Sequence, residues 1–573
     1  MILNRQNSKQ GCTKIIQNNT TLTDKNEIAE AFNNYFTNVA VKISSDLPRT
    51  DVDYRDFLCD FNFSDTFFLP PLTPNAIKEI TLGLKLTGGG HLEIPAKMFK
   101  IVIDLIAVPL CDIFNKCIEI SYFPDLFKIA RVVPIFKCND PLLLNNYRPI
   151  SLLSVFSKIF EKHLCKHMSN YLTQKKILCE QQCGFISGLS TDISIAKLLK
   201  HVHEGLDTRK YGICVFLDLR KAFDLVNKEI LLTKLNTYGI RGSTNQLIRS
   251  YLDNRQQYVS VNGICSSTSL IEIGVPQGSN MGPLLFLIFI NDLVKSSTVL
   301  NFNLFADDTS IYLSDLDENN LFNVMNVELA KVCNWILANR LALNIDKTVY
   351  LLFAGKKSVS NSNEIYMFNN AISRKNETKF LGLLIDDKLS WKSHTNHIHS
   401  KVSKLIGLLF RVSDCFTKTA LKTLYYSFIY PHLLYGVIFW GSVAKRNFES
   451  IFRLQKRPVR ILTKSQKYAH TDPLFEDKEI LKLSTILRFE MCKFIHRDLH
   501  CNNIFDLASV SSVHSYNTRF NNNISLTRVR TSLAAKFVLH EGVKLYNNLP
   551  NELKCIDDLP KFKRTLKAYF LTN

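Results

Sequence analysis

Apolar residues recur every three or four positions along much of the chain. In KNEIAEAFNNYFTNVAVKI (25–43), Ile28, Phe32 and Phe36 fall on one side of a helix, which predicts an amphipathic α-helix. Further stretches show the same period, at residues 101–119, 152–164, 225–252 and 318–341. Helical periodicity also dominates beyond about residue 390.

Three other stretches have the pattern of β-strands. GICVFLDLR (212–220) is a nearly continuous apolar run, which is typical of a central strand buried on both faces, and an aspartate stands near its end. QQYVSVNG (256–263) alternates and closes on Asn-Gly, a hairpin signal. NFNLFADDTSIYL (301–313) predicts strand, tight turn and strand, with two aspartates at the turn. The order is therefore helices, then mixed β and α, then mostly helices.

The length of the chain indicates its number of structural units, and its net charge indicates a class of binding partner. The 573 residues are enough for two to four structural units, and 46% hydrophobic with 21% charged residues is a globular composition. Lysine and arginine exceed aspartate and glutamate by 71 to 51, a net charge of +20. Such an excess attracts a polyanion such as nucleic acid, although a merely basic soluble protein would have the same balance.

Cysteine and histidine do not form a metal-binding pattern. The 15 cysteines are scattered, which suits a reducing compartment. Cys179 and Cys183 have no second pair at a useful distance, and His394, His397 and His399 have no obvious Cys or carboxylate partner for zinc.

The sequence predicts no membrane segment. The N-terminus MILNRQNSKQ has no apolar core behind its charge, so it is not a signal peptide. LLFLIFI (284–290) is too short to span a bilayer, and the longer run at 425–440 is interrupted by Pro431 and His432. We therefore expect a soluble, intracellular protein.

The adjacent aspartates are energetically unfavourable unless another interaction offsets their cost. Asp307 and Asp308 repel each other and lose hydration near a core. One solution is divalent metal: two Mg²⁺ ions about 4 Å apart, held with Asp218, would suit nucleotidyl transfer. The other is an exposed hairpin turn that needs no ligand, and the dipeptide alone favours this turn.

Motifs around these aspartates decide between the two. Through a series of motifs that follow one another along the chain, the sequence resembles the reverse transcriptases of non-LTR retrotransposons, particularly the jockey-like (LINE-type) elements. The matching motifs are NNYRPISLLSVFSKIFEK (145–162), QQCGFISGLST (182–191 from its second Gln), VFLDLRKAFDLVN (215–227), SYLDNRQQYVSVNG (250–263), GVPQGSNMGPLLFLIFINDL (274–293), FADDTSIY (305–312), NRLALNIDKT (339–348), KFLGLLID (379–386), HSYNTRF (514–520) and LYNNLP (545–550).

The resemblance implies a catalytic set. Asp218, Asp307 and Asp308 match the metal-binding triad, with two Mg²⁺ ions, or Mn²⁺ in their place. Lys347 matches the basic residue proposed to protonate the leaving pyrophosphate, a role that suits its tunable pKa. A solvated loop lysine would also explain Lys347.

It also implies contacts with nucleotide and nucleic acid. Phe223 matches the residue under the incoming sugar that rejects a 2′-hydroxyl, and Gln277 and Gly278 match a loop against the nascent base pair. Arg148 matches a fingers residue able to hold template or triphosphate oxygens. The segment that grips the primer is matched by Lys379, Phe380, Leu381 and Gly382. A core phenylalanine, a structural turn and a core strand end are the corresponding alternatives.

The chain departs from the family pattern in four places. Ile186 stands where an arginine usually follows Gly-Phe, and LTGGGHLEIP (86–95) lacks the usual Pro and Asp. Arg220 replaces a small residue two positions after Asp218 and could crowd the metal site. Pro458 in RLQKRPVR is expected to break a helix.

Together these observations predict an α/β (α+β) right-hand polymerase. Residues 1–115 would be a largely helical N-terminal extension or linker, 116–386 the fingers and palm around a small antiparallel sheet, and 387–573 a mainly helical thumb and basic C-terminal region. The expected activity is RNA-directed DNA synthesis from deoxynucleoside triphosphates, with an RNA template and a DNA primer or target strand. The protein would work in nucleus and cytoplasm as a ribonucleoprotein, without a membrane.

The residues before the fingers lack the acidic and His constellation of an endonuclease, so the chain looks like the polymerase part of an element. No zinc knuckle or ribonuclease H set is apparent. Two alternatives stay open: a catalytically impaired nucleic-acid-binding remnant, favoured by Ile186 and Arg220, and a translated genomic fossil without a protein-level role.

Overall fold

A computed structural model describes residues 12–17, 19–58, 65–85, 90–92, 94–360, 362–510 and 523–572. The HSYNTRF motif (514–520) lies outside these residues, as do five residues of the 86–95 segment.

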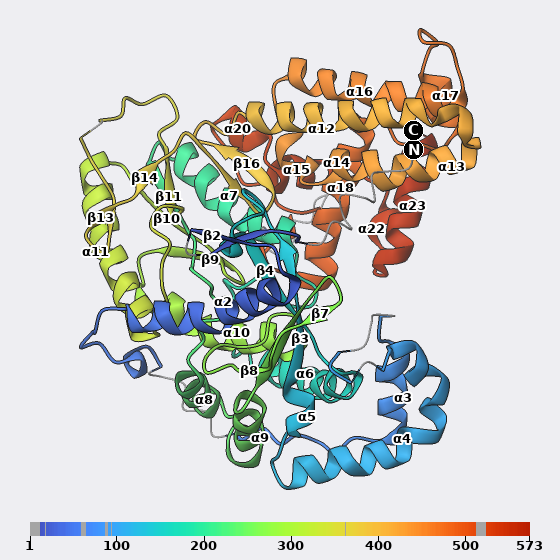
Figure 1. Ribbon diagram of the computed structural model, residues 1–573. Helices are drawn as coiled ribbons and strands as arrows, with labels where there is room; N and C mark the ends of the chain where they lie inside the picture. Colours follow the sequence, from blue (N-terminus) through green and yellow to red (C-terminus); the bar gives the residue numbers. More distant parts are fainter. Residues whose placement is uncertain are drawn as a thin grey trace.

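A five-stranded sheet in the order β14-β11-β5-β10-β9 lies at the centre of the molecule (Figure 1). Its strands are β5 (Tyr211–Leu217), β9 (Asn301–Phe305), β10 (Asp308–Asp315), β11 (Val349–Phe353) and β14 (Ser373–Arg374). All pairs are antiparallel except β11 with β14. The predicted central strand and the predicted hairpin are therefore confirmed, as β5 and as β9–β10.

The two faces of β5 belong to different hydrophobic cores. Ile213, Val215 and Leu217 pack in one cluster with helices α10 (Met281–Ile290) and α11 (Glu318–Ala338). Cys214 and Phe216 pack in another cluster with α7 (Thr191–Asp207) and the C-terminal helices. Since both faces are buried, the strand has no polar alternation, and this is why its sequence is a continuous apolar run.

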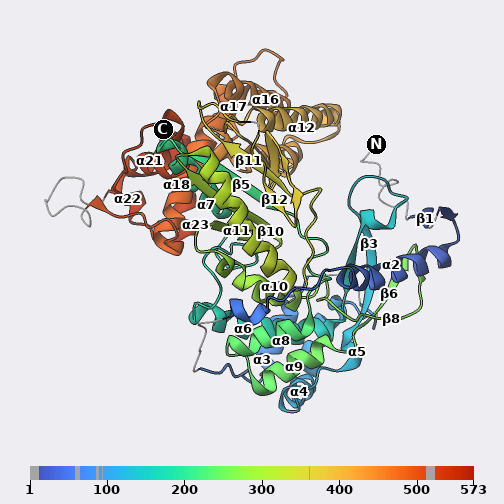
Figure 2. The ribbon, with the colours of Figure 1, turned by 90° about the vertical axis from the view of Figure 1, so that its left-hand side faces the viewer.

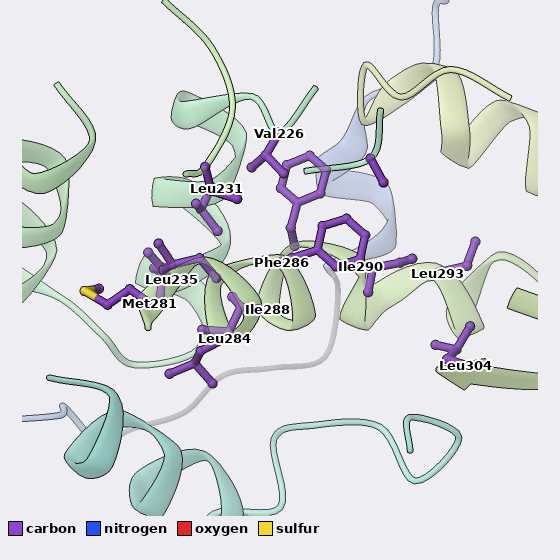
Figure 3. Packing of buried hydrophobic residues seen from close by; sticks show 14 of the residues in the cluster. Val226, Leu231, Leu235, Met281, Leu284, Phe286, Ile288, Ile290, Leu293 and Leu304 are labelled. Atoms are coloured by element: carbon purple, nitrogen blue, oxygen red, sulfur yellow. The ribbon is translucent and has the colours of Figure 1, made fainter. Parts of the chain in front are cut away.

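The first two thirds of the chain contain many helices, of which α7 and α11 contact the central sheet. They are α2 (Lys25–Ser45), α3 (Pro74–Leu82), α4 (Ala96–Glu119), α5 (Asp125–Lys128), α6 (Val155–Gln174), α7 (Thr191–Asp207), α8 (Lys228–Thr237), α9 (Gly242–Leu252), α10 (Met281–Ile290) and α11 (Glu318–Ala338). The 225–252 stretch is thus two helices rather than one. The LLFLIFI run lies in α10, which is buried on all sides among apolar residues of several elements (Figure 3).

A second sheet has the order β4-β3-β6-β7, with β8 also paired to β6. Its strands are β3 (Ile129–Phe136), β4 (Tyr147–Leu152), β6 (Gln256–Val261), β7 (Ile264–Cys265) and β8 (Ser269–Leu270). Asn262 and Gly263 both have positive φ, 53° and 85°, and confirm the predicted hairpin turn. The sequence predicted only a loop before α6, but β4 lies there; it is an edge strand, so it tolerates Pro149.

The described residues beyond the hairpin β15–β16 (Glu377–Phe380, Leu383–Asp386) are mostly helical, as the periodicity predicted. The helices are α12 (Lys392–Arg411), α13 (Lys418–Leu424), α14 (Tyr430–Leu434), α15 (Val437–Trp440), α16 (Lys445–Thr463), α17 (Asp472–Asp477), α18 (Leu483–Arg497), α20 (Ser532–Ala535), α21 (Val543–Asn547), α22 (Asn551–Lys554) and α23 (Leu559–Thr572). Figure 2 shows them gathered on one side of the sheet. None of the described helices combines the length and apolar character needed to cross a bilayer.

Pro458 does not break a helix, so that expectation is wrong. Helix α16 continues through it, and Pro458 is buried beside Leu454 and Val459 where α16 packs on α12. The missing N–H removes one intrahelical hydrogen bond, and the buried apolar face offsets that loss.

Candidate active site

Three carboxylates lie at one end of the central sheet. Asp218 follows β5 directly, Asp308 is the first residue of β10, and Asp307 lies in the turn before it. Thr309 is opposite Leu217 in the β10–β5 register, so Asp308 and Asp218 form the next pair beyond it. The structure therefore places the three predicted aspartates on adjacent strand ends.

The side chain of Gln182, which comes from a distant segment of the chain, holds the turn that carries Asp307. This side chain is 2% exposed, and its Oε1 accepts hydrogen bonds from the backbone N–H groups of Ala306 (3.0 Å) and Gly184 (2.8 Å). Ala306 has a positive φ of 56°, an unusual backbone conformation for alanine. A Cβ at Gly184 would lie 2.4 Å from the Ala306 nitrogen, so only glycine allows this approach. The QQCG segment thus fixes the carboxylate-bearing turn.

The carboxylates repel one another. Partial burial, then the negative charges of Asp307 and Asp218, raise the pKa of Asp308 to about 6, while the positive charges of Arg148 and Lys137 act in the opposite direction. At Asp308, burial and the two neighbouring carboxylates therefore outweigh the nearby positive charges.

Replacing Asp308 with asparagine is expected to stabilise the metal-free protein by about 1 kcal/mol at pH 7, a figure reduced for solvent screening because this partly buried carboxylate still reaches the solvent. Since the pKa is raised on folding, the wild-type protein loses stability as pH rises from about 4 to 6, and the loss then levels off. Thermal unfolding in EDTA at several pH values measures the difference. An Asp308→Asn gain that is the same at pH 4 and pH 7, or that an exposed control Asp414→Asn reproduces, would contradict this account.

Basic side chains face the carboxylates across a cleft of about 400 Å³. The Lys347 ammonium lies 3.8 Å from Asp218 Oδ2, and the Asp218 N–H donates to Thr348 Oγ1 at 3.4 Å. Lys137, at the end of β3, also lines the cleft, while Arg148 on β4 is close enough for its charge to lower the pKa of Asp308. Lys137 was not predicted from the sequence, because the strand β3 that places it at the cleft was not predicted.

Phe223 and Gln277 do not line the cleft, and each contacts neighbouring parts of the protein instead. The Phe223 ring stacks on Phe286 with centroids 4.7 Å apart. Gln277 donates from Nε2 to Asp224 Oδ1 at 2.7 Å, and its carbonyl accepts from Ser151 N–H at 2.8 Å. These bonds tie the 274–280 loop to the segment after Asp218 and to β4.

Gly278 has a φ of 105°, and an added Cβ would lie 2.8 Å from the Ser151 carbonyl oxygen. Both the conformation and the close approach require glycine at this turn.

The predicted primer segment forms the turn of the β15–β16 hairpin. Leu381 and Gly382 have φ values of 43° and 87°, and with Lys379 they line the same cleft as Asp218. Phe380 is 4% exposed and packs on Phe216, with ring centroids 5.4 Å apart, so its ring belongs to the core. The Tyr435 hydroxyl donates to the Leu381 carbonyl and supports the turn.

The donor set suits a hard divalent cation in its chemistry. Within the described residues, no group of three or more His, Cys, Asp and Glu side chains is arranged so that it could hold a metal ion. The triad nevertheless offers carboxylate oxygens, which Mg²⁺ prefers; burial first and then the charges of Asp307 and Asp218 raise the pKa of Asp308, and a cation would offset the second of these causes. In chemical type the three carboxylates match such a cation.

Comparison with known proteins agrees with this arrangement. Residues 136–385 match the family described as reverse transcriptase (RNA-dependent DNA polymerase). The chain is 29% identical over 439 residues to the probable RNA-directed DNA polymerase from transposon BS of Drosophila melanogaster, which covers 73% of this chain and 47% of the relative. It is 26% identical to the RNA-directed DNA polymerase from mobile element jockey of the same organism, over 76% of this chain and 49% of the relative.

The chain spans about half the length of these curated relatives. The region matched by the family contains the whole central sheet and all three aspartates, whereas β3 of the second sheet lies before it except for Phe136. Residues 136–385 are therefore similar to the reverse transcriptase family, and the chain is similar over about three quarters of its length to the RNA-directed DNA polymerases of the BS and jockey elements.

Proposed function

We propose that this chain is an RNA-directed DNA polymerase that adds deoxynucleotides to a primer 3′-hydroxyl on an RNA template. The observation that carries the proposal is the position of Asp218, Asp307 and Asp308 on adjacent strand ends within a reverse transcriptase domain. A cleft beside them holds both acidic and basic side chains.

The three aspartates would hold the divalent metal, Mg²⁺ or Mn²⁺. Two such ions supply charge neutralisation and alignment of the attacking and leaving oxygens. Lys347 is 64% exposed and next to Asp218, so its ammonium can reach a pyrophosphate oxygen in the cleft and donate a proton there. Lys137, which lines the cleft, and Arg148, which is close enough to lower the pKa of Asp308, add positive charge and would bind triphosphate or template oxygens.

The enzyme would select deoxynucleotides through the rigidly held ring of Phe223. Phe223 is braced by Phe286, and the adjoining Asp224 is hydrogen-bonded to Gln277. A ring that cannot move aside would collide with a 2′-hydroxyl, and the Gln277–Gly278 turn would contact the nascent base pair.

The nucleic acid would follow the hairpin turn at 379–382 and the basic helical region. In this assignment residues 1–115 are an extension, 116–386 the fingers and palm, and 387–573 the thumb and C-terminal region. The net charge of +20 would make binding strongly dependent on salt.

Primer extension on an RNA template in Mg²⁺ tests the proposal, with EDTA and Asp307→Asn as controls. Synthesis that depends on Mg²⁺ and disappears in Asp307→Asn is the expected result. If wild type and variant bind RNA equally but neither extends the primer, the chain is a nucleic-acid-binding remnant, which Ile186 in place of the usual arginine would explain.

Gln182→Leu is expected to slow primer extension about 10- to 100-fold. It removes the acceptor for two buried N–H groups and frees the turn that carries Asp307, and displacement of about 1 Å can cost this much. Gln181→Leu is the matched control, because that neighbouring side chain is exposed. Equal rates for the two variants, at a temperature where both are folded, would refute a role for the Gln182 amide.

A further inference from the structure

Helix α4 presents apolar side chains on both of its faces. Its inner face packs on α3, α6 and α9 through residues such as Phe99, Ile103 and Phe114, which are at most 3% exposed. Its outer face carries a second apolar set, here called the α4 stripe: Met98 (57% exposed), Ile101 (73%), Val102 (38%), Leu105 (82%), Val108 (57%) and Ile113 (50%).

This outer face is unusual within the same molecule. The outer face of α16, for comparison, carries exposed arginines such as Arg453 and Arg457. A helix that is apolar all round is normally buried, and a contiguous exposed apolar patch marks an interaction site. In Figures 1 and 2 α4 runs along the lower edge of the molecule, away from the central sheet and its carboxylates.

The charges beside the stripe favour one partner over others. Lys97 lies at its N-terminal end and Asp112 at its C-terminal end; both are exposed, and neither makes an ion pair among the described residues. Their midpoint along the helix falls between Asp104 and Leu105, and Leu105 is the most exposed residue of the stripe. A second α4 packed antiparallel about that point would place each Lys97 at the height of the other copy's Asp112. A parallel pair would instead oppose like charges.

We propose that the α4 stripe is a homodimer interface, in which two copies of this chain pack α4 against α4 antiparallel about a two-fold axis near Leu105. The same patch serves both copies, so the contact closes on itself and does not extend into a filament. It leaves the catalytic cleft of each copy open, so the two copies could hold two nucleic acid strands at once.

The test is the molar mass of the full chain by sedimentation or light scattering over a range of concentrations, after nuclease treatment and in high salt. Wild type is expected to move from 65.7 kDa toward twice that mass as concentration rises. Leu105→Glu should raise the dissociation constant about 100-fold or more, since each dimer would bury two unpaired carboxylates. Val327→Glu is the matched control, because Val327 is an exposed (61%) apolar residue on α11.

A charge exchange tests the antiparallel geometry. Lys97→Glu and Asp112→Lys, each alone, should weaken the dimer about tenfold, and the double variant should restore it. A wild-type chain that stays monomeric, or a dimer unaffected by Leu105→Glu, would overturn the proposal. Failure of the double variant to recover would overturn the antiparallel arrangement. None of these readouts depends on polymerase activity, so the dimer and the proposed function can fail separately.

Discussion

Replacing Asp218 with asparagine is expected to lower the rate of RNA-templated DNA synthesis by a factor on the order of 10³ or more. Asp218 ends the strand between β11 and β10, and it is the carboxylate next to both Asp308 and the Lys347 ammonium. An amide keeps its shape but loses the charge that would hold a divalent ion. Without that charge neither the attacking hydroxyl nor the leaving pyrophosphate is stabilised.

Single-nucleotide addition at saturating primer–template measures this loss. Asp414→Asn is the control, since Asp414 is an exposed aspartate of the C-terminal helical region that does not line the cleft. RNA binding and the unfolding midpoint of Asp218→Asn should stay close to wild type. A variant that retains more than about a tenth of the wild-type rate would remove Asp218 from the catalytic set.

Lys234→Met is expected to destabilise the fold by about 3–5 kcal/mol, because it leaves the Asp292 carboxylate buried without its partner. Lys234 Nζ lies 2.7 Å from Asp292 Oδ1, and both side chains are 0% exposed. The ammonium also donates to the Phe289 carbonyl at 2.6 Å, and Trp335 Nε1 donates to the same carboxylate oxygen at 3.2 Å. This cluster ties α8, α10 and α11 together beneath the central sheet.

Thermal unfolding should show the loss as a midpoint about 5 °C or more below wild type. Lys445→Met is a suitable comparison, since the Lys445–Glu449 pair is exposed and removing it should change the midpoint little. Lys234→Met combined with Asp292→Leu should recover much of the stability, because no charge is then left unpaired. If the single and double variants unfold alike, the pair is not the source of the stability.

The elements that the sequence predicted well are those with strong local signals. β5 is a continuous apolar run, the Asn262–Gly263 turn has the residues that positive φ requires, and the aspartate turn joins two strands. For the triad, local pattern was not enough: Asp307–Asp308 alone was more compatible with an exposed turn, and the order of surrounding motifs supplied the argument. The structure adds the register that makes Asp308 and Asp218 neighbours.

What sequence reasoning missed depends on contacts between distant residues. β3 and β4 each contain a proline, Pro134 and Pro149, which counts against a strand when only the sequence is read. Lys137 is at the site only because β3 ends there. The hydrogen bond from Ala306 to Gln182 spans 124 residues, and no spacing rule could indicate it. Pro458 was misjudged for the opposite reason, since a local rule was applied where the packing of α16 on α12 decides the outcome.

The two cores that share β5 also limit how the gene can be cut for expression. A product ending near residue 386 would keep Cys214, Phe216 and the α7 residues packed with them, but would lack their partners in α12, α14, α18 and α23. The bared apolar surface would favour aggregation. The shortest fragment worth purifying therefore includes the helices through α23, and insolubility of a shorter one would say nothing about its catalytic residues.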